Sequence, residues 1–208
     1  MPRAAWAARS LLLAWLLAFT LTACGNRLPP LPRLASGDVV LAFGDSLTHG
    51  TGADPEASYP ARLAGLIGRE VVNAGVPGET TAEGLRRLPE VLDAHQPRLL
   101  LLCLGGNDLL RQMDPVQTEA NLAAMIDLAR ARGVAVVLVG VPEPRLFGGV
   151  ADFYPRLAER FNLHYEGEVF VDVLKTAGLK ADAVHPNARG YAQVAERLAE
   201  LLRQGGAL

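Results

Sequence analysis

The chain has 208 residues, of which 50% are hydrophobic and 20% are charged, with a formal charge of −2. This balance leaves no basic excess for a nucleic-acid-binding role, so we expect no nucleic-acid partner. The length beyond the N-terminal segment suits one domain with a substantial core.

The N-terminus has the features of a secretory signal peptide. Arg3 and Arg9 provide positive charge, and residues 10–21 form an apolar run. The run is shorter than the roughly 20 residues that a membrane-spanning helix needs. We therefore predict that residues 1–23 are a signal peptide, whose removal takes away two arginines and no acidic residue.

The signal segment closes on the sequence LTAC, which ends at Cys24. This sequence resembles the bacterial lipobox, in which the cysteine is lipidated and becomes the first residue of the mature chain. We expect an exported lipoprotein that faces the periplasm, is anchored in the membrane through Cys24 and behaves as a monomer. Gly25 and Asn26 follow without an acidic residue, which favours the outer membrane. Residues 24–37, which are rich in proline, are expected to be an extended tether to a domain at 38–208.

Beyond the tether, short apolar runs alternate with longer amphipathic segments. The continuous hydrophobicity of the short runs favours strands covered on both faces, and strand–helix alternation predicts a three-layer α/β/α sandwich with a parallel five-stranded sheet. The expected strands are 39–43, 71–73, 99–104, 134–141 and 169–171. The expected helices are 59–67, 81–94, 115–132, 151–161 and 187–203.

Loops at the carboxyl ends of the first three strands carry candidate functional residues. Ser46 follows the first strand, Gly78 lies in the loop after the second, and Asn107 lies in the loop after the third. Parallel sheets bind ligands outside the carboxyl ends of their strands. These three residues are therefore expected to lie near one another.

Ser46 is the candidate nucleophile by elimination. The other serines are Ser10 in the signal peptide, Ser36 in the tether and Ser58 before a helix. The surroundings of Ser46 are not a Gly-x-Ser-x-Gly elbow, because Thr48 stands where the second glycine would be. From the residues alone, Ser46 is either a nucleophile or the cap of the following helix.

A serine nucleophile needs a base, and His185 is the best placed of four histidines. Asp182 precedes it by three residues, and a turn of that length lets the carboxylate accept from Nδ1 and leaves Nε2 as the base. The alternative is a turn cap beside a surface histidine. His49 is close to Ser46 in sequence, but groups on one short turn rarely point at each other.

Acyl transfer also needs donors for the developing oxyanion. The backbone N–H groups of Ser46 and Gly78 and the side-chain amide of Asn107 are the candidates. Cys103 lies in an apolar run and is expected to be an inert buried thiol. We expect no metal and no cofactor, because the histidines lack ligand spacing.

These segments together resemble the GDSL or SGNH hydrolase family, which has four separated motif blocks. The blocks here are GDSLT, GVPGET, GGND and DAVHPN, and the similarity extends from Val39 to the final helix. The resemblance implies a flavodoxin-like serine esterase that cleaves carboxylic esters or thioesters, as periplasmic thioesterases, arylesterases and lysophospholipases do. It implies these roles: Ser46 as nucleophile, His185 as base, Asp182 as its orienting acid, and Ser46, Gly78 and Asn107 as the oxyanion hole. It also implies a structural role for Asp45, which supports the turn.

Two alternatives stay open at this point. One is a carbohydrate O-acetylesterase of the same fold, and the other is a non-catalytic lipoprotein that binds phosphate or sugar at the strand ends. The loop at 142–150, expected to be a substrate loop, favours a small acyl ester or lysophospholipid with an apolar chain. The apolar residues behind this preference are Leu146, Phe147, Val150, Leu109 and Leu110.

Overall fold

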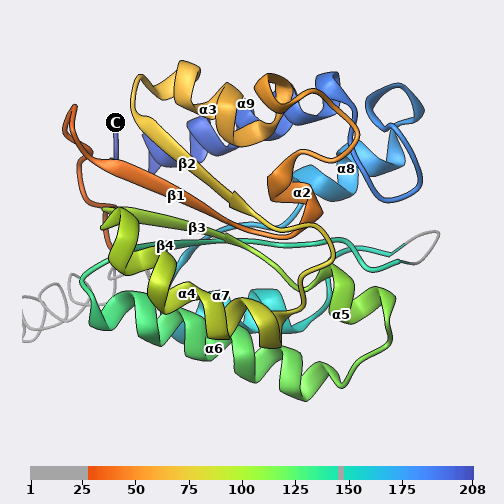
Figure 1. Cartoon of the computed structure of the whole chain (residues 1–208), viewed down its shortest axis with the longest axis horizontal. Helices are drawn as coiled ribbons and strands as arrows, with labels where there is room; N and C mark the ends of the chain where they lie inside the picture. The colour runs from red at the N-terminus through yellow and green to blue at the C-terminus, as the bar shows by residue number, and fades with distance from the viewer. Residues whose placement is uncertain (1–27, 145–147) are drawn as a thin grey trace, which may run out of the picture.

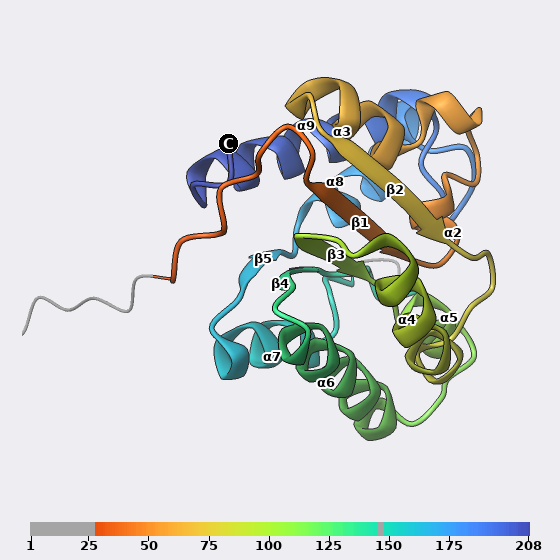
Figure 2. The ribbon, with the colours of Figure 1, turned by 60° about the vertical axis from the view of Figure 1, so that its left-hand side comes forward.

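The computed structural model describes residues 28–144 and 148–208. The predicted signal peptide and the predicted lipidation site Cys24 lie outside the described residues, as do Leu146 and Phe147 of the expected substrate loop. Figures 1 and 2 show the arrangement of the helices and strands.

The centre of the molecule is a parallel five-stranded sheet in the order β2-β1-β3-β4-β5. Every residue of β3 is buried, because helices cover both faces of this central strand. Strand β2 is at one edge and is partly exposed, so the expectation of two covered faces does not extend to it. The strands are β1 (Val39–Gly44), β2 (Glu70–Gly75), β3 (Leu99–Cys103), β4 (Ala135–Val139) and β5 (His164–Glu166).

Helices α3, α8 and α9 cover one face of the sheet, and α4, α6 and α7 cover the other (Figures 1 and 2). This arrangement confirms the predicted three-layer sandwich. The short helices α2 and α5 lie at the carboxyl edge of the sheet. The helices are α2 (Ser46–His49), α3 (Tyr59–Ile67), α4 (Thr81–His95), α5 (Gly106–Leu110), α6 (Pro115–Ala131), α7 (Phe153–Phe161), α8 (Val169–Lys175) and α9 (Ala188–Gln204), with 3-10 turns η1 (Pro55–Ala57) and η2 (Ala177–Leu179).

Local sequence signals explain where the long helices begin and end. The Asp114 side chain accepts from the N–H of Val116, and Pro115 occupies the first turn of α6, where a missing N–H costs nothing. At the start of α4, Thr80 and Glu83 form a reciprocal capping box. These caps stabilise the helix ends beside the loops that carry the candidate site.

The predicted fifth strand at 169–171 is wrong, because these residues begin helix α8. Glu166 accepts from the N–H groups of Glu168 and Val169 through Oε1, which satisfies donors at the helix start. Val169, Phe170 and Val173 then bury one helical face. The real edge strand β5 precedes this turn and has only three residues, two of them partly exposed, so it shows no continuous apolar run.

The described part of the expected tether lies against the domain. Leu31 and Leu34 are buried, and their N–H groups donate to the carbonyls of Gly205 and Ala207 at 2.8 Å each. The ring Nε2 of His164, at the start of β5, lies 3.0 Å from the carbonyl of Pro29. From Pro29 onward the chain is therefore part of the domain, and it packs beside the C-terminus at the amino ends of the strands (Figure 2).

In residues 28–144 and 148–208, every helix is too short or too polar to cross a membrane.

Candidate active site

The candidate site lies where the strand order changes direction. Strand β1 pairs with β2 on one side and with β3 on the other, and the connections from β1 and β3 run to opposite faces of the sheet. Parallel sheets bind ligands at the carboxyl ends of the strands beside such a point. Ser46 begins α2 after β1, and Asn107 lies in α5 after β3. The two residues therefore flank the same crevice.

The turn that presents Ser46 depends on a close backbone approach. A Cβ at Gly44 would lie 2.0 Å from the carbonyl oxygen of Cys103 on β3, so only glycine allows β1 to leave the sheet here. Asp45 then caps α2, with Oδ1 accepting from the N–H of Leu47 at 3.0 Å. Ser46 is thus held at the first position of a short helix directly after the strand.

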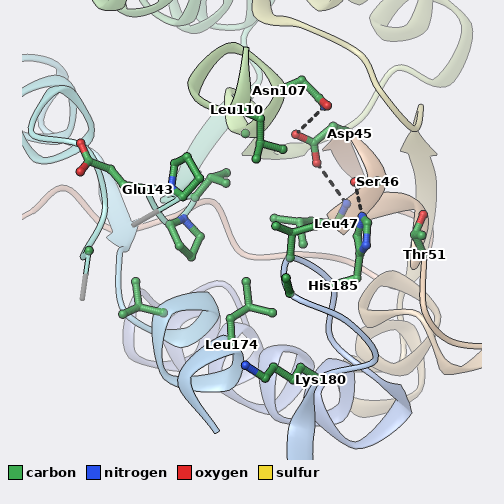
Figure 3. A pocket seen from close by; sticks show the side chains of 18 of the residues that line it. Asp45, Ser46, Leu47, Thr51, Asn107, Leu110, Glu143, Leu174, Lys180 and His185 are labelled. Carbon is green, nitrogen blue, oxygen red and sulfur yellow. Dashed lines mark hydrogen bonds between the residues drawn. The ribbon is translucent and has the colours of Figure 1, made fainter. Parts of the chain in front are cut away.

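Ser46, His185 and Asp182 form a hydrogen-bonded chain, as predicted. The distance between His185 Nε2 and Ser46 Oγ is 3.0 Å (Figure 3), and that between His185 Nδ1 and Asp182 Oδ2 is 2.8 Å. The other carboxylate oxygen of Asp182 accepts from the N–H groups of Val184 and His185. These contacts bring together residues separated by 139 positions in the sequence.

The hydrogen bonds of Asp182 also decide its charge. Partial burial acts to raise its pKa, but the bonds from the His185 ring and the N–H groups of Val184 and His185 outweigh burial and hold the pKa below its ordinary value. An ionised Asp182 accepts a hydrogen bond from the Nδ1–H group of His185. The Nε2 atom of neutral His185 is then free to accept the proton of Ser46.

The three predicted oxyanion donors line one cleft. Gly78 has a φ of +82°, a conformation that favours glycine, in a turn closed by the hydrogen bond from the N–H of Glu79 to the carbonyl of Val76. The amide of Asn107 donates to the carbonyl of Glu79 at 3.0 Å. Within the described part of the chain, the N–H groups of Ser46 and Gly78 donate to no protein acceptor. Both are therefore available to an oxygen in the cleft.

Asp45 lies behind these groups and is almost completely buried. Burial raises its pKa to about 6, although the N–H groups of Leu47 and Gly106 oppose the shift. Its Oδ2 atom is 3.5 Å from the amide nitrogen of Asn107 (Figure 3). Asp45 thus joins the turn of Ser46 to the loop after β3, in agreement with its expected structural role.

The cleft has a volume of about 880 Å³ and largely apolar walls. Of the apolar residues named from the sequence, Leu110 lines it, whereas Leu109 and Val150 pack against the core. Sequence reasoning missed the wall provided by α8, because these residues were assigned to a strand. The three-residue spacing of Val171 and Leu174 was the available signal. The apolar lining residues are Leu47, Pro77, Leu110, Val141, Pro142, Pro144, Val171, Leu174, Ala183 and Val184.

The remaining histidines and the described cysteine lie outside the cleft lining. His49 is on the exposed side of α2, and His95 ends α4. Cys103 is a free buried thiol, and burial raises its pKa. No three His, Cys, Asp or Glu side chains of residues 28–144 and 148–208 are grouped as a metal site.

Comparison with known proteins shows the family of this chain. Residues 42–193 match the model of the GDSL-like lipase/acylhydrolase family. The chain is 34% identical over 182 residues to thioesterase 1/protease 1/lysophospholipase L1 of Escherichia coli K12, covering 82% of this chain and 86% of that protein. It is 38% identical over 162 residues to esterase TesA of Pseudomonas aeruginosa, covering 76% and 73%. A crystal structure of TesA superimposes with a TM-score of 0.73 at 31% identity, covering 81% of this chain and 99% of that one. The chain therefore belongs to the GDSL-like lipase/acylhydrolase family and is a hydrolase of the esterase class.

Proposed function

We propose that this hydrolase cleaves carboxylic esters or thioesters through an acyl-enzyme on Ser46. The observation that carries the proposal is the chain of hydrogen bonds from Ser46 Oγ through His185 to Asp182. His185 Nε2 takes the Ser46 proton as Oγ attacks the carbonyl carbon. The tetrahedral oxyanion accepts from the N–H groups of Ser46 and Gly78 and from the Asn107 amide.

The intermediate collapses when His185 gives its proton to the leaving alcohol or thiol. Water then enters, loses a proton to Nε2 and attacks the acyl carbon. As this second tetrahedral intermediate collapses, the bond to Ser46 Oγ breaks, His185 returns the proton to Oγ, and the acid is released. Throughout, the Asp182 carboxylate stabilises the protonated ring. The chain's own residues supply every proton transfer in this sequence.

Replacement of Ser46 tests the mechanism. Ser46→Ala is expected to abolish p-nitrophenyl butyrate hydrolysis and fluorophosphonate labelling while the near-ultraviolet circular dichroism spectrum stays unchanged. Ser36→Ala, at an exposed serine of the N-terminal segment, is the matched control and should keep both activities. Labelling that persists in Ser46→Ala would overturn the assignment and revive a non-catalytic binding role.

The apolar cleft supports acyl substrates longer than acetate. Its walls extend from Leu47 and Leu110 to Leu174 on α8, far more apolar surface than an acetyl group needs. We expect kcat/KM to rise from p-nitrophenyl acetate to medium-chain esters. A higher rate on acetylated xylan than on any of these esters would favour the O-acetylesterase alternative.

Two lysines in the cleft lining are evidence for a substrate that also carries an anionic group, such as the phosphate of a lysophospholipid. Lys175 and Lys180 are the only lysines in the sequence, and both line the cleft. Neither forms an ion pair with a described carboxylate. Lys175→Met/Lys180→Met is expected to lower kcat/KM on lysophosphatidylglycerol about 2- to 30-fold, since each exposed pair is worth about 0.2–1 kcal/mol and the variant removes two. Activity on neutral monoacylglycerol should stay unchanged, and equal losses on both would refute the role.

We also propose that Cys24 is lipidated and holds the enzyme, as a monomer, at the periplasmic face of the outer membrane. The LTAC sequence supports this proposal. Metabolic labelling with an alkyne palmitate analogue is expected to mark the wild type and to fail with Cys24→Ser, which should fractionate with soluble periplasmic protein. Equal labelling of both proteins would count against lipidation at Cys24.

A further inference from the structure

Arg87 is the residue that joins the loop of Gly78 to helix α4. Its Nε and Nη2 atoms donate to the two carboxylate oxygens of Glu79 at 2.7 and 2.6 Å. Nη2 also donates to the carbonyl of Ala74 at 2.9 Å. The Glu79 side chain is only 5% exposed and the Arg87 side chain 25%, so the pair is largely buried, and its two parallel hydrogen bonds restrict its geometry.

A third contact ties Arg87 to the strand that presents Ser46. The guanidinium carbon lies 4.1 Å from the centre of the Phe43 ring on β1. Arg87 therefore contacts the end of β2, the loop after it, and β1. These contacts lie on the face of the sheet that α4 covers, away from the substrate cleft, whose lining does not include Arg87.

Glu79 transmits this restraint to the proposed oxyanion donors. Its backbone N–H closes the turn that contains Gly78, and its carbonyl accepts from the Asn107 amide at 3.0 Å. A shift of Glu79 would therefore move both the N–H of Gly78 and the side chain of Asn107. Only the donor of Ser46 would stay in place.

We infer that Arg87 is a positioning residue that sets two of the three oxyanion donors through Glu79. The inference rests on the proposed oxyanion hole. If the ion pair between Arg87 and Glu79 only stabilised the fold, Arg87 would not need its hydrogen bond to the carbonyl of Ala74. Nor would the carbonyl of Glu79 need to accept from the Asn107 amide. Because a displacement of about 1 Å can cost 10²-fold in rate, the loss of Arg87 should appear in kcat rather than in substrate binding.

The test is a kinetic comparison of Arg87→Met with Arg132→Met. Arg132 forms an exposed pair with Asp93 at the far end of α4, which makes it a matched control. We expect Arg87→Met to lower kcat on p-nitrophenyl butyrate about 10- to 100-fold with KM nearly unchanged. Arg132→Met should leave both constants unchanged. Equal kcat in the wild type and a folded Arg87→Met would overturn the inference.

A double-variant cycle separates positioning from stability. In an Asn107→Ala background, Arg87→Met should lower kcat less than in the wild type, because one of the donors it positions is already missing. Full additivity would refute action through Asn107. If Arg87→Met does not fold, Arg87→Lys takes its place, since lysine keeps the charge but loses the two-pronged geometry. Unchanged kcat in Arg87→Lys would then overturn the inference. Failure of the oxyanion hole itself would be distinct, because Asn107→Ala alone would then keep full activity.

Discussion

The buried carboxyl of Asp45 predicts a specific dependence of stability on pH. Burial raises its folded pKa from 3.8 to about 6. Between these values the folded state binds more protons than the unfolded state, so the free energy of unfolding contributed by Asp45 falls as the pH rises. At 1.36 kcal/mol per pH unit, the full loss is about 3 kcal/mol, of which about 2.4 kcal/mol falls between pH 4 and pH 7.

Asp45→Asn isolates this contribution, because asparagine does not titrate. We expect the free energy of unfolding of the wild type, minus that of Asp45→Asn, to fall by about 2.4 kcal/mol from pH 4 to pH 7. Urea unfolding at a series of pH values measures the difference, and the carbon-13 shift of the Asp45 carboxyl measures the pKa directly. A difference that is constant across this range, or a carboxyl that titrates near 4, would refute the reasoning.

Other substitutions test separate parts of the structure. Asp182→Asn is expected to lower kcat about 10- to 1000-fold, because paired charges in a partly exposed site interact by about 1–4 kcal/mol; unchanged esterase activity would contradict this. The pKa of Asp182 is lowered, so its contribution to stability is present above its ordinary pKa and is lost as the pH falls toward the folded value, which acid unfolding of the same variant will measure. Leu34→Ala should reduce the free energy of unfolding by about 2–5 kcal/mol in urea while kcat/KM stays unchanged, since Leu34 lies at the opposite edge from the cleft. Thr80→Ala should cost about 1 kcal/mol by removing a helix cap, and an unchanged thermal midpoint would argue against the capping box.

The sequence limited the candidate site to a few residues, and the structure brings these residues together in one cleft. Four serines reduced to Ser46, and the loops after successive parallel strands had to meet at one edge. The histidine that acts as the base for Ser46 was harder to predict, because His49 is nearer to Ser46 in the sequence. The spacing of Asp182 and His185 indicated the correct partner because a short turn lets the carboxylate reach Nδ1.

The features that the sequence did not reveal depend on contacts between distant segments. Residues 169–171 look like a strand in isolation, and only the caps from Glu166 show that a helix starts there. The two leucines of the N-terminal segment were hidden among prolines, so their burial against the C-terminus was not foreseen. Likewise, nothing in the local pattern around Arg87 indicates that its partner, Glu79, also accepts a hydrogen bond from Asn107. Glu79 follows β2 and Asn107 follows β3, the two strands on either side of β1.

The docking of residues 29–34 determines which way an anchored enzyme faces. These residues lie at the amino ends of the strands (Figure 2). The residues that line the cleft follow the carboxyl ends of the strands. With Cys24 acylated as proposed, only four residues separate it from Pro29, and these five residue steps span at most about 18 Å. A connection this short would keep the amino ends of the strands close to the bilayer that holds the lipid. The cleft would then face the aqueous compartment. In that orientation the enzyme would bind esters from solution or from a facing surface, and not lipids of the bilayer that holds its own anchor.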